Sequence, residues 1–135
     1  MHVLVTGGCG YVGTKLTQAL LNRPDYRVTV LDAMWFGNFL APDLRLTILE
    51  RDMRQIDDVD LSGFDTIFHL ANIANDPAVE LNPYASWDVN VLATMRLADR
   101  AARQGVKQLV SARSRNTTRP RWWRSACSSV MPDRW

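Results

Sequence analysis

The fold of this chain is decided by residues 2–13, which read HVLVTGGCGYVG. Residues 2–6 form a short apolar, β-branched run that stops at a glycine pair, and this pattern predicts a buried strand. Apolar residues then recur at helical spacing, with a proline just past the last of them, so a helix is expected from Tyr11 to about Asn22. These apolar positions are Val12, Leu16, Ala19 and Leu20. The chain therefore begins with a strand, a glycine loop and a helix.

The remaining segments up to residue 112 alternate between strand and helix patterns. Further strands are expected at 27–31, 44–49, 66–70 and 107–111, and the second of these alternates apolar and polar residues as an edge strand does. Asn82-Pro83 predicts the start of a long helix that ends at Gly105. Its apolar face is expected at Val91, Met95, Ala98 and Ala102. The pattern predicts an α/β fold with a doubly wound (Rossmann) parallel sheet of order 3-2-1-4-5, truncated after about the fifth strand.

The glycine loop and the end of the second strand together predict a dinucleotide site. Glycines spaced as Gly8-x-Gly10-x-x-Gly13, or as Gly7-x-x-Gly10-x-x-Gly13, let the backbone approach a pyrophosphate at the start of a helix. Asp32 ends the second strand 19 residues after Gly13, near the spacing of a carboxylate that accepts hydrogen bonds from an adenosine ribose. This carboxylate would repel a 2′-phosphate, so NAD is favoured over NADP.

Two other motifs in the same loop are interpreted as coincidences. Thr14 precedes Lys15, which is the reverse of the order that a nucleoside-triphosphate loop requires. Tyr11 and Lys15 form a Tyr-x-x-x-Lys pair, but inside the phosphate loop they cannot also reach the reacting end of a cofactor. We therefore expect neither a triphosphatase nor a catalytic pair at this place.

Residues 1 to about 112 resemble the extended short-chain dehydrogenase/reductase family, specifically its NAD-dependent sugar-nucleotide epimerases and dehydratases. The resemblance is carried by 6–13 (TGGCGYVG), Asp52-Met53-Arg54, His69-Leu70-Ala71, Asn75-Asp76-Pro77, Asn90-Val91-x-x-Thr94 and Gly105-Val106-Lys107. Asn72 stands where a second alanine is usual. The resemblance implies a bound NAD, a nucleotide-sugar substrate and, for the intact family, a homodimer. It places the cofactor contacts at Gly7, Gly10, Tyr11, Val12, Gly13, Asp32, Asp52, Met53, Leu70, Ala71 and Asn90.

Several of these residues have a purely structural alternative. His69 is interpreted as a packed strand residue rather than a catalyst. Asp52 is either a cofactor contact or a solvated carboxylate at a strand end, and Asn90 is either near the cofactor or facing solvent on its helix. Trp35 and Trp87 are interpreted as packing residues.

The family pattern breaks at Arg113, just after the expected fifth strand. In the family, a serine or threonine and a Tyr-x-x-x-Lys helix follow that strand and carry out the proton transfer, but no tyrosine occurs after Tyr84. Ser114 is the one residue that could align with the family's catalytic serine. We therefore assign no catalytic residue, and expect the chain alone to be catalytically incomplete. A shifted reading frame after codon 112 is our hypothesis for the break, and the gene's nucleotide sequence tests it.

Composition separates the chain into two parts at the same point. Residues 1–112 hold ten Lys/Arg and thirteen Asp/Glu, a net charge of −3, whereas residues 113–135 hold six Arg and one Asp, a net charge of +5. The first part is interpreted as an incomplete NAD-binding domain and the second as a non-native or disordered basic tail rich in Arg and Trp. An alternative is an NAD-sensing or nucleic-acid-binding protein that binds nucleic acid through this tail. The tail, however, shows no helical or strand periodicity that would place its Arg and Trp side chains on one face.

The sequence also bears on location and on metals. No apolar stretch approaches the ~20 residues that span a bilayer, and no signal peptide is recognisable, so we expect a cytoplasmic protein without a membrane partner. The two cysteines, Cys9 and Cys127, are far apart and belong to no Cys/His cluster, so no metal site is predicted.

Overall fold

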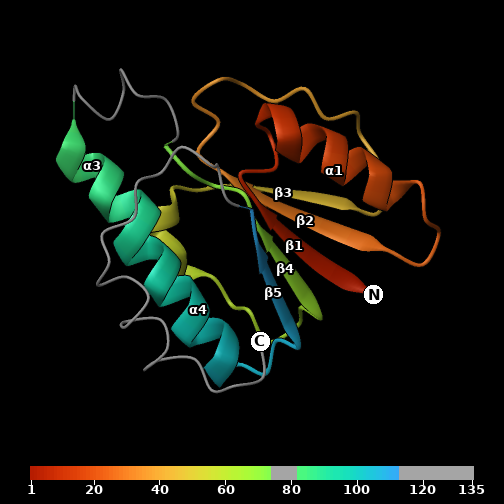
Figure 1. Ribbon diagram of the computed structural model, residues 1–135. Helices are drawn as coiled ribbons and strands as arrows, with labels where there is room; N and C mark the ends of the chain where they lie inside the picture. The colour runs from red at the N-terminus through yellow and green to blue at the C-terminus, as the bar shows by residue number, and fades with distance from the viewer. Residues whose placement is uncertain (74–81, 113–135) are drawn as a thin grey trace.

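The computed structural model describes residues 1–73 and 82–112. The Asn75-Asp76-Pro77 motif and the basic tail lie outside the described residues. Five parallel strands pair in the order β3-β2-β1-β4-β5, which confirms the predicted order and the doubly wound α/β class (Figure 1). The strands are β1 (His2–Thr6), β2 (Arg27–Asp32), β3 (Leu46–Glu50), β4 (Thr66–His69) and β5 (Gln108–Ser111). The edge position expected for the third strand is confirmed.

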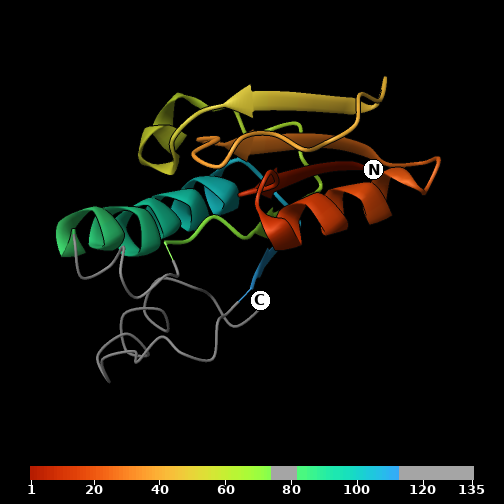
Figure 2. The same cartoon turned by 90° about the horizontal axis from the view of Figure 1, so that it is seen from above.

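Helices cover both faces of this sheet. One face is covered by α1 (Tyr11–Leu21), and the other by the 3₁₀ helix η1 (Met53–Asp58) together with a long composite helix, as Figure 2 shows from above. The composite helix runs through α3 (Pro83–Trp87), the π-helical segment η2 (Asp88–Ala93) and α4 (Thr94–Arg103). The Asn82 side chain accepts a hydrogen bond from the Ala85 amide at 3.0 Å, which confirms the predicted start of this helix.

The central strands divide their side chains between two hydrophobic clusters because successive residues of a strand point to opposite faces. Val3 and Val5 of β1 pack with Leu20 on the α1 side, whereas Leu4 packs with Leu97 on the other side. All five of these residues are buried. A strand that is buried on both faces has to be apolar throughout, which explains the continuous apolar run that opens the sequence.

The buried face of the composite helix differs from the predicted one. Met95 is 40% exposed and Ala102 is exposed, so the expected face is wrong. The buried positions are Val89, Ala93, Leu97 and Ala101. Both sets have helical spacing, and long-range contacts decide between them. The buried set packs in one hydrophobic cluster with Met53 and Ile56 of η1.

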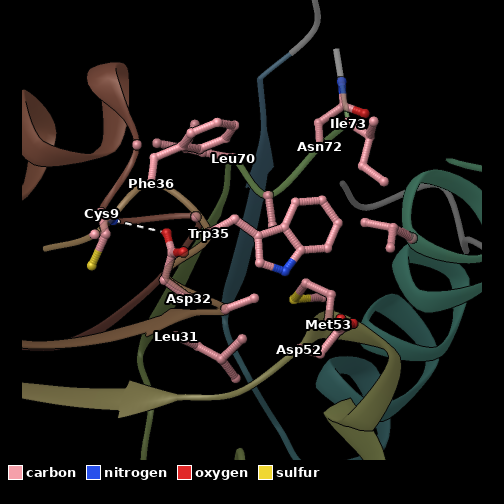
Figure 3. Close-up of a pocket in the computed structure, with 16 residues that line it drawn as sticks. Cys9, Leu31, Asp32, Trp35, Phe36, Asp52, Met53, Leu70, Asn72 and Ile73 are labelled. Atoms are coloured by element: carbon pink, nitrogen blue, oxygen red, sulfur yellow. Dashed lines mark hydrogen bonds between the residues drawn. The ribbon is translucent and has the colours of Figure 1, made fainter. Parts of the chain in front are cut away.

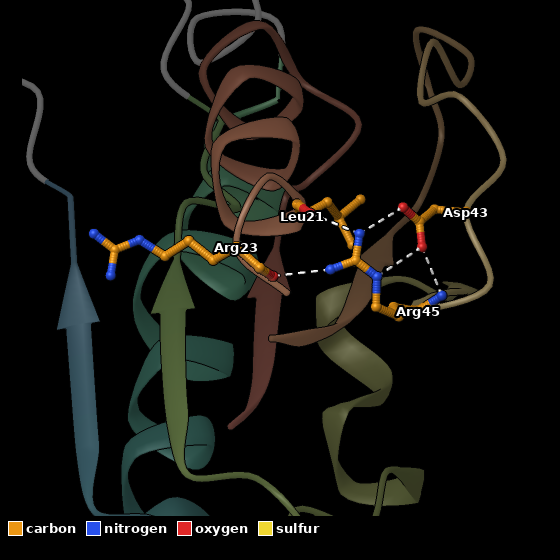
Figure 4. A network of polar contacts seen from close by, with 4 residues as sticks. All are labelled: Leu21, Arg23, Asp43 and Arg45. Atoms are coloured by element: carbon orange, nitrogen blue, oxygen red, sulfur yellow. Dashed lines mark hydrogen bonds and ion pairs between the residues drawn. The ribbon is translucent and has the colours of Figure 1, made fainter. Parts of the chain in front are cut away.

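A polar network outside the sheet joins the end of α1 to the start of β3 (Figure 4). The Arg45 guanidinium donates to the carbonyls of Leu21 at 2.7 Å and Arg23 at 2.8 Å, and it pairs with Asp43 at 3.0 Å. Carbonyls at the end of a helix have no partner within the helix, and a nearby cation satisfies them. This network therefore closes the C-terminal end of α1.

None of the helices in residues 1–73 and 82–112 is long and apolar enough to cross a membrane.

Candidate functional site

A pocket opens at the carboxyl ends of β1, β2 and β4, where the loops that follow these strands meet (Figure 3). In an open parallel sheet, this edge is where the strand order reverses and where ligands bind. The lining residues are Gly7, Cys9, Gly10, Leu31, Asp32, Ala33, Trp35, Phe36, Gly37, Asp52, Met53, Leu70, Ala71, Asn72, Ile73 and Val89.

The glycine loop forms the wall of this pocket between β1 and α1. Gly7 has a φ of +73°, and a Cβ at this position would lie 2.6 Å from the backbone nitrogen of Ala71. A Cβ on Gly13 would collide with the carbonyl oxygen of Gly7. The loop thus packs backbone against backbone, which only glycine permits. Its backbone at Gly7 and Gly10 lines the pocket.

The start of α1 carries no cap of its own. Gly10 occupies the N-cap position without a side-chain hydrogen bond, and no acidic residue lies in the first turn. The first amides of a helix have no partner within it and carry the positive end of the helix dipole, which favours an anion. Tyr11 and Val12, 79% and 60% exposed, stand at this end, where Lys15 donates a hydrogen bond to the Tyr11 hydroxyl at 3.1 Å.

Asp32 joins the glycine loop to the loop that follows β2. One carboxylate oxygen accepts a hydrogen bond from the Cys9 amide at 2.9 Å, and the other accepts one from the Met34 amide at 2.8 Å. Burial, followed by the charge of Asp32, raises the pKa of the Cys9 thiol to about 11. The thiol is therefore protonated near neutral pH, which argues against a nucleophilic role.

Asp52 and Met53 form the wall of the pocket beyond β3. The Asp52 carboxylate accepts hydrogen bonds from the backbone and the guanidinium of Arg54, the closest at 2.7 Å, and the side-chain bond with Arg54 lowers the pKa of Asp52. The carboxylate thus caps η1 and stays ionised. Met53 is buried, with 4% of its surface exposed.

The wall after β4 consists of Leu70, Ala71, Asn72 and Ile73, and it is held in place by Asn90. The Asn90 side chain accepts a hydrogen bond from the Ile73 amide at 2.8 Å and donates one to the Ile73 carbonyl at 2.9 Å. Asn90 lies in the π-helical segment η2, and such segments are frequent at functional sites. This paired contact fixes the path of the chain as it leaves β4.

His69, the last residue of β4, links this wall to β1 and α4 through hydrogen bonds. Its Nδ1 lies 2.7 Å from the Thr6 hydroxyl, and its Nε2 lies 2.9 Å from the Thr94 hydroxyl, which donates to the Asn90 carbonyl at 3.0 Å. His69 is 5% exposed, and burial lowers its pKa to about 4. The interpretation of His69 as a packed strand residue is confirmed.

Seven of the eleven residues predicted to contact a cofactor line the pocket: Gly7, Gly10, Asp32, Asp52, Met53, Leu70 and Ala71. Tyr11, Val12 and Gly13 lie at the adjoining start of α1 without lining it, and Asn90 reaches it only through Ile73. No three His, Cys, Asp or Glu side chains gather into a possible metal site within residues 1–73 and 82–112.

The interpretation of Trp35 as a packing residue is wrong, because Trp35 is 59% exposed and lines the pocket. Trp87 is 43% exposed, so its side chain packs in part. Phe36 and Ile73 also line the pocket and were not predicted. The one signal that could have indicated Trp35 and Phe36 is their position a few residues after Asp32.

Comparison with protein families places nearly the whole chain in one of them. Residues 3–119 match the model of the NAD dependent epimerase/dehydratase family. The chain is 32% identical over 114 residues to a UDP-glucose 4-epimerase of Corynebacterium glutamicum, covering 82% of this chain and 34% of the relative. It is 31% identical over 122 residues to a probable UDP-arabinose 4-epimerase of Arabidopsis thaliana, covering 81% of this chain and 29% of the relative.

Solved structures give the same fold. An epimerase from Methanothermobacter thermautotrophicus superposes with a TM-score of 0.77 at 27% identity, over 84% of this chain and 35% of that one. A UDP-glucose 4-epimerase from Thermus thermophilus, solved in complex with NAD, superposes with a TM-score of 0.68 at 26% identity, over 81% of this chain and 36% of that one. The chain thus spans about a third of the length of the relatives that it matches.

Proposed function

This chain belongs to the NAD dependent epimerase/dehydratase family, and from that premise we propose that residues 1–112 bind NAD in the pocket at the carboxyl ends of the strands. The observation that carries the proposal is that the closely packed backbone of the glycine loop and the Asp32 carboxylate line one pocket, beside the uncapped start of α1. A dinucleotide needs all three: close backbone approach, amides for the pyrophosphate and a carboxylate for the ribose.

The pyrophosphate would lie against the glycine loop. The backbone of Gly7 and Gly10 lines the pocket, and the amides of Tyr11, Val12 and Gly13 begin the adjoining helix. These groups would hold the two phosphates through backbone hydrogen bonds and the helix dipole. Tyr11 and Lys15 would add a hydroxyl and a positive charge at the same end.

The adenosine would lie on the side of Asp32. This carboxylate is suited to accept hydrogen bonds from the ribose hydroxyls, and Asp52 and Met53 on the neighbouring loop would contact the adenine. Leu70 and Ala71 would form the wall beside the cofactor after β4. For Asn90 we propose a positioning role, since its side-chain amide is occupied by the backbone of Ile73.

In the whole protein, we propose an action on a nucleotide sugar, a nucleoside-diphosphate hexose. NAD, when bound, would supply a reversible hydride acceptor for the transient oxidation of a ring carbon of the sugar, on which an epimerisation or a dehydration depends. The 135 residues contain no Tyr-x-x-x-Lys pair after the fifth strand, so this chain by itself would bind the cofactor without turning over a sugar nucleotide. The whole protein would act as a homodimer in the cytoplasm.

The choice of cofactor gives the sharpest test, by calorimetric titration with NAD and NADP. The chain should bind one NAD and should bind NADP at least ~10-fold more weakly, because the Asp32 carboxylate repels a 2′-phosphate. Asp32→Asn should weaken NAD binding by roughly 10- to 100-fold, the value of a hydrogen bond to a charged group, and should narrow the preference for NAD.

Asp58→Asn is the matched control for this substitution. Asp58 is an exposed acid on η1 outside the pocket, and its only ion pair in the described residues, with Arg51, is 4.0 Å long. This variant should bind NAD as the unaltered chain does. Absence of NAD binding by the unaltered chain, or an unchanged affinity in Asp32→Asn, would contradict the proposal.

A further inference from the structure

The side chain of Trp35 is unusual because it is large, apolar and open to the pocket. It lines the pocket with Asp32 and Met53, yet 59% of its surface is exposed. Figure 3 shows the indole spread across the middle of the pocket, with Met53 near its nitrogen and Asp32 on the other side. An exposed indole beside a binding pocket offers a flat apolar face that a ligand can cover.

The backbone around Trp35 is held in a sparsely populated conformation. Met34 has a φ of +54°, and non-glycine residues with such a φ are uncommon and cluster at functional sites. The Met34 amide donates to Asp32 at 2.8 Å, and its carbonyl accepts from the Gly37 amide at 2.9 Å. This tight turn fixes the position of Trp35 at the edge of the pocket.

The same carboxylate that holds this turn also holds the glycine loop. Asp32 accepts one hydrogen bond from Met34 and another from Cys9, so the turn with Trp35 and the phosphate-facing loop share one anchor. Trp35 is thereby placed at the Asp32 end of the pocket. In a dinucleotide held by this carboxylate, the base next to that ribose is adenine.

We propose that Trp35 stacks on the adenine of the bound dinucleotide and supplies much of the affinity for that base. The inference rests on the proposed NAD-binding function and adds a residue that recognises one half of the ligand. Adenine would lie between the indole and the thioether of Met53, since both aromatic rings and sulfur contact a flat π-system favourably.

The test compares the unaltered chain with Trp35→Ala and Trp35→Phe, titrated calorimetrically with NAD and with ADP-ribose, which keeps the adenine but lacks the nicotinamide. Trp35→Ala should weaken both ligands by the same factor, roughly 5- to 100-fold, as expected for base stacking on an aromatic ring. Trp35→Phe should keep most of the affinity. Stacking on Trp35 should also quench tryptophan fluorescence when NAD binds to the unaltered chain, and Trp35→Phe should lose this quenching.

Phe39→Ala is the control, since Phe39 is an aromatic residue of the same loop, 74% exposed, that does not line the pocket. Its affinity for NAD should not change. If the unaltered chain bound neither NAD nor ADP-ribose, this result would contradict the proposed NAD-binding function itself. Normal binding with an unchanged affinity in Trp35→Ala, or a loss seen with NAD but not with ADP-ribose, would overturn the stacking role alone.

Discussion

The two sides of the pocket are built in different ways. On the side of β1 and α1, the wall is backbone: Gly7 approaches Ala71 so closely that no side chain fits between them. On the side of β4 and α4, the wall is held by side chains, through the His69 hydrogen bonds and the clamp of Asn90 on Ile73. The backbone side depends on the absence of atoms, whereas the β4 side depends on hydrogen bonds between residues 17 to 63 positions apart. We therefore expect substitutions on the backbone side to abolish NAD binding, and substitutions on the β4 side to lower stability and NAD affinity by smaller amounts.

The largest effect is expected from Gly7→Ala. A Cβ there meets the Ala71 backbone, and the φ of +73° adds conformational strain, so we expect a loss of about 3 kcal/mol or more in stability and loss of NAD binding. Chemical denaturation and NAD titration measure the two. Gly105→Ala is the control, because Gly105 has a similar φ of +77° with nothing within 4 Å, and it should cost only ~1 kcal/mol. Equal costs at both positions would show that crowding at Gly7 is unimportant.

The next effect is a pH dependence that arises from His69. Its pKa is lowered by burial to about 4 in the folded chain, against about 6.5 in the unfolded chain, so the unfolded state binds more protons between these values. The contribution of neutral His69 to the free energy of unfolding should be present above pH 6.5 and should be lost, by about 3 kcal/mol, as the pH approaches 4.

Urea denaturation between pH 7 and pH 5, above the range in which paired carboxylates lose their contribution, measures most of this slope. His69→Gln cannot titrate, and it should show a flatter profile even though it is less stable at neutral pH. A profile as steep as that of the unaltered chain would assign the pH dependence to other groups.

A smaller effect is expected from Asn90→Ala, which removes both hydrogen bonds to Ile73. The unpaired backbone groups should cost about 1–3 kcal/mol of stability, and NAD affinity should fall because the wall after β4 is less well positioned. Thermal melting and titration follow the two effects. Gln18→Ala, on the exposed face of α1, should change neither quantity. If Asn90→Ala kept full stability and affinity, the clamp would have no function.

The smallest effect is expected outside the pocket, at Arg45. Arg45→Ala removes the partially exposed bonds that close α1, so we expect a loss of only ~1 kcal/mol and no change in NAD affinity. Arg23→Ala is a matched control, because Arg23 takes part in this network through its carbonyl while its side chain points away (Figure 4). A lower NAD affinity in Arg45→Ala would mean that this network also shapes the pocket.

The sequence predicts the backbone side of the pocket well because its determinants are local. The glycine spacing, the strand before it and Asp32 lie within 31 consecutive residues, and the predicted strands agree with the observed ones to within two residues at each end. The resemblance to NAD-dependent sugar-nucleotide epimerases and dehydratases is confirmed for the family, and so is NAD as the cofactor of that family.

The β4 side of the pocket and the turn at Met34 that carries Trp35 were predicted less well. The buried face of the composite helix depends on packing in one hydrophobic cluster with Met53 and Ile56 of η1, about 40 residues earlier in the chain, and helical spacing alone fits two faces. The contact of Asn90 with Ile73 depends on the packing of η2 against the loop after β4. Trp35 was mistaken for a packing residue because an indole is usually buried, and only the turn at Met34 places it in the pocket.

The central claim is that both sides of the pocket hold one NAD molecule, and amide chemical shifts of the ¹⁵N-labelled chain during NAD titration test it most directly. We expect the signals of Gly7 and Gly10 on the backbone side, and of Met53 and Ile73 across the pocket, to shift together and saturate at one common Kd. The amide of Arg45, outside the pocket, should stay in place. Shifts confined to one side, or no shifts at a saturating excess of NAD, would contradict the account.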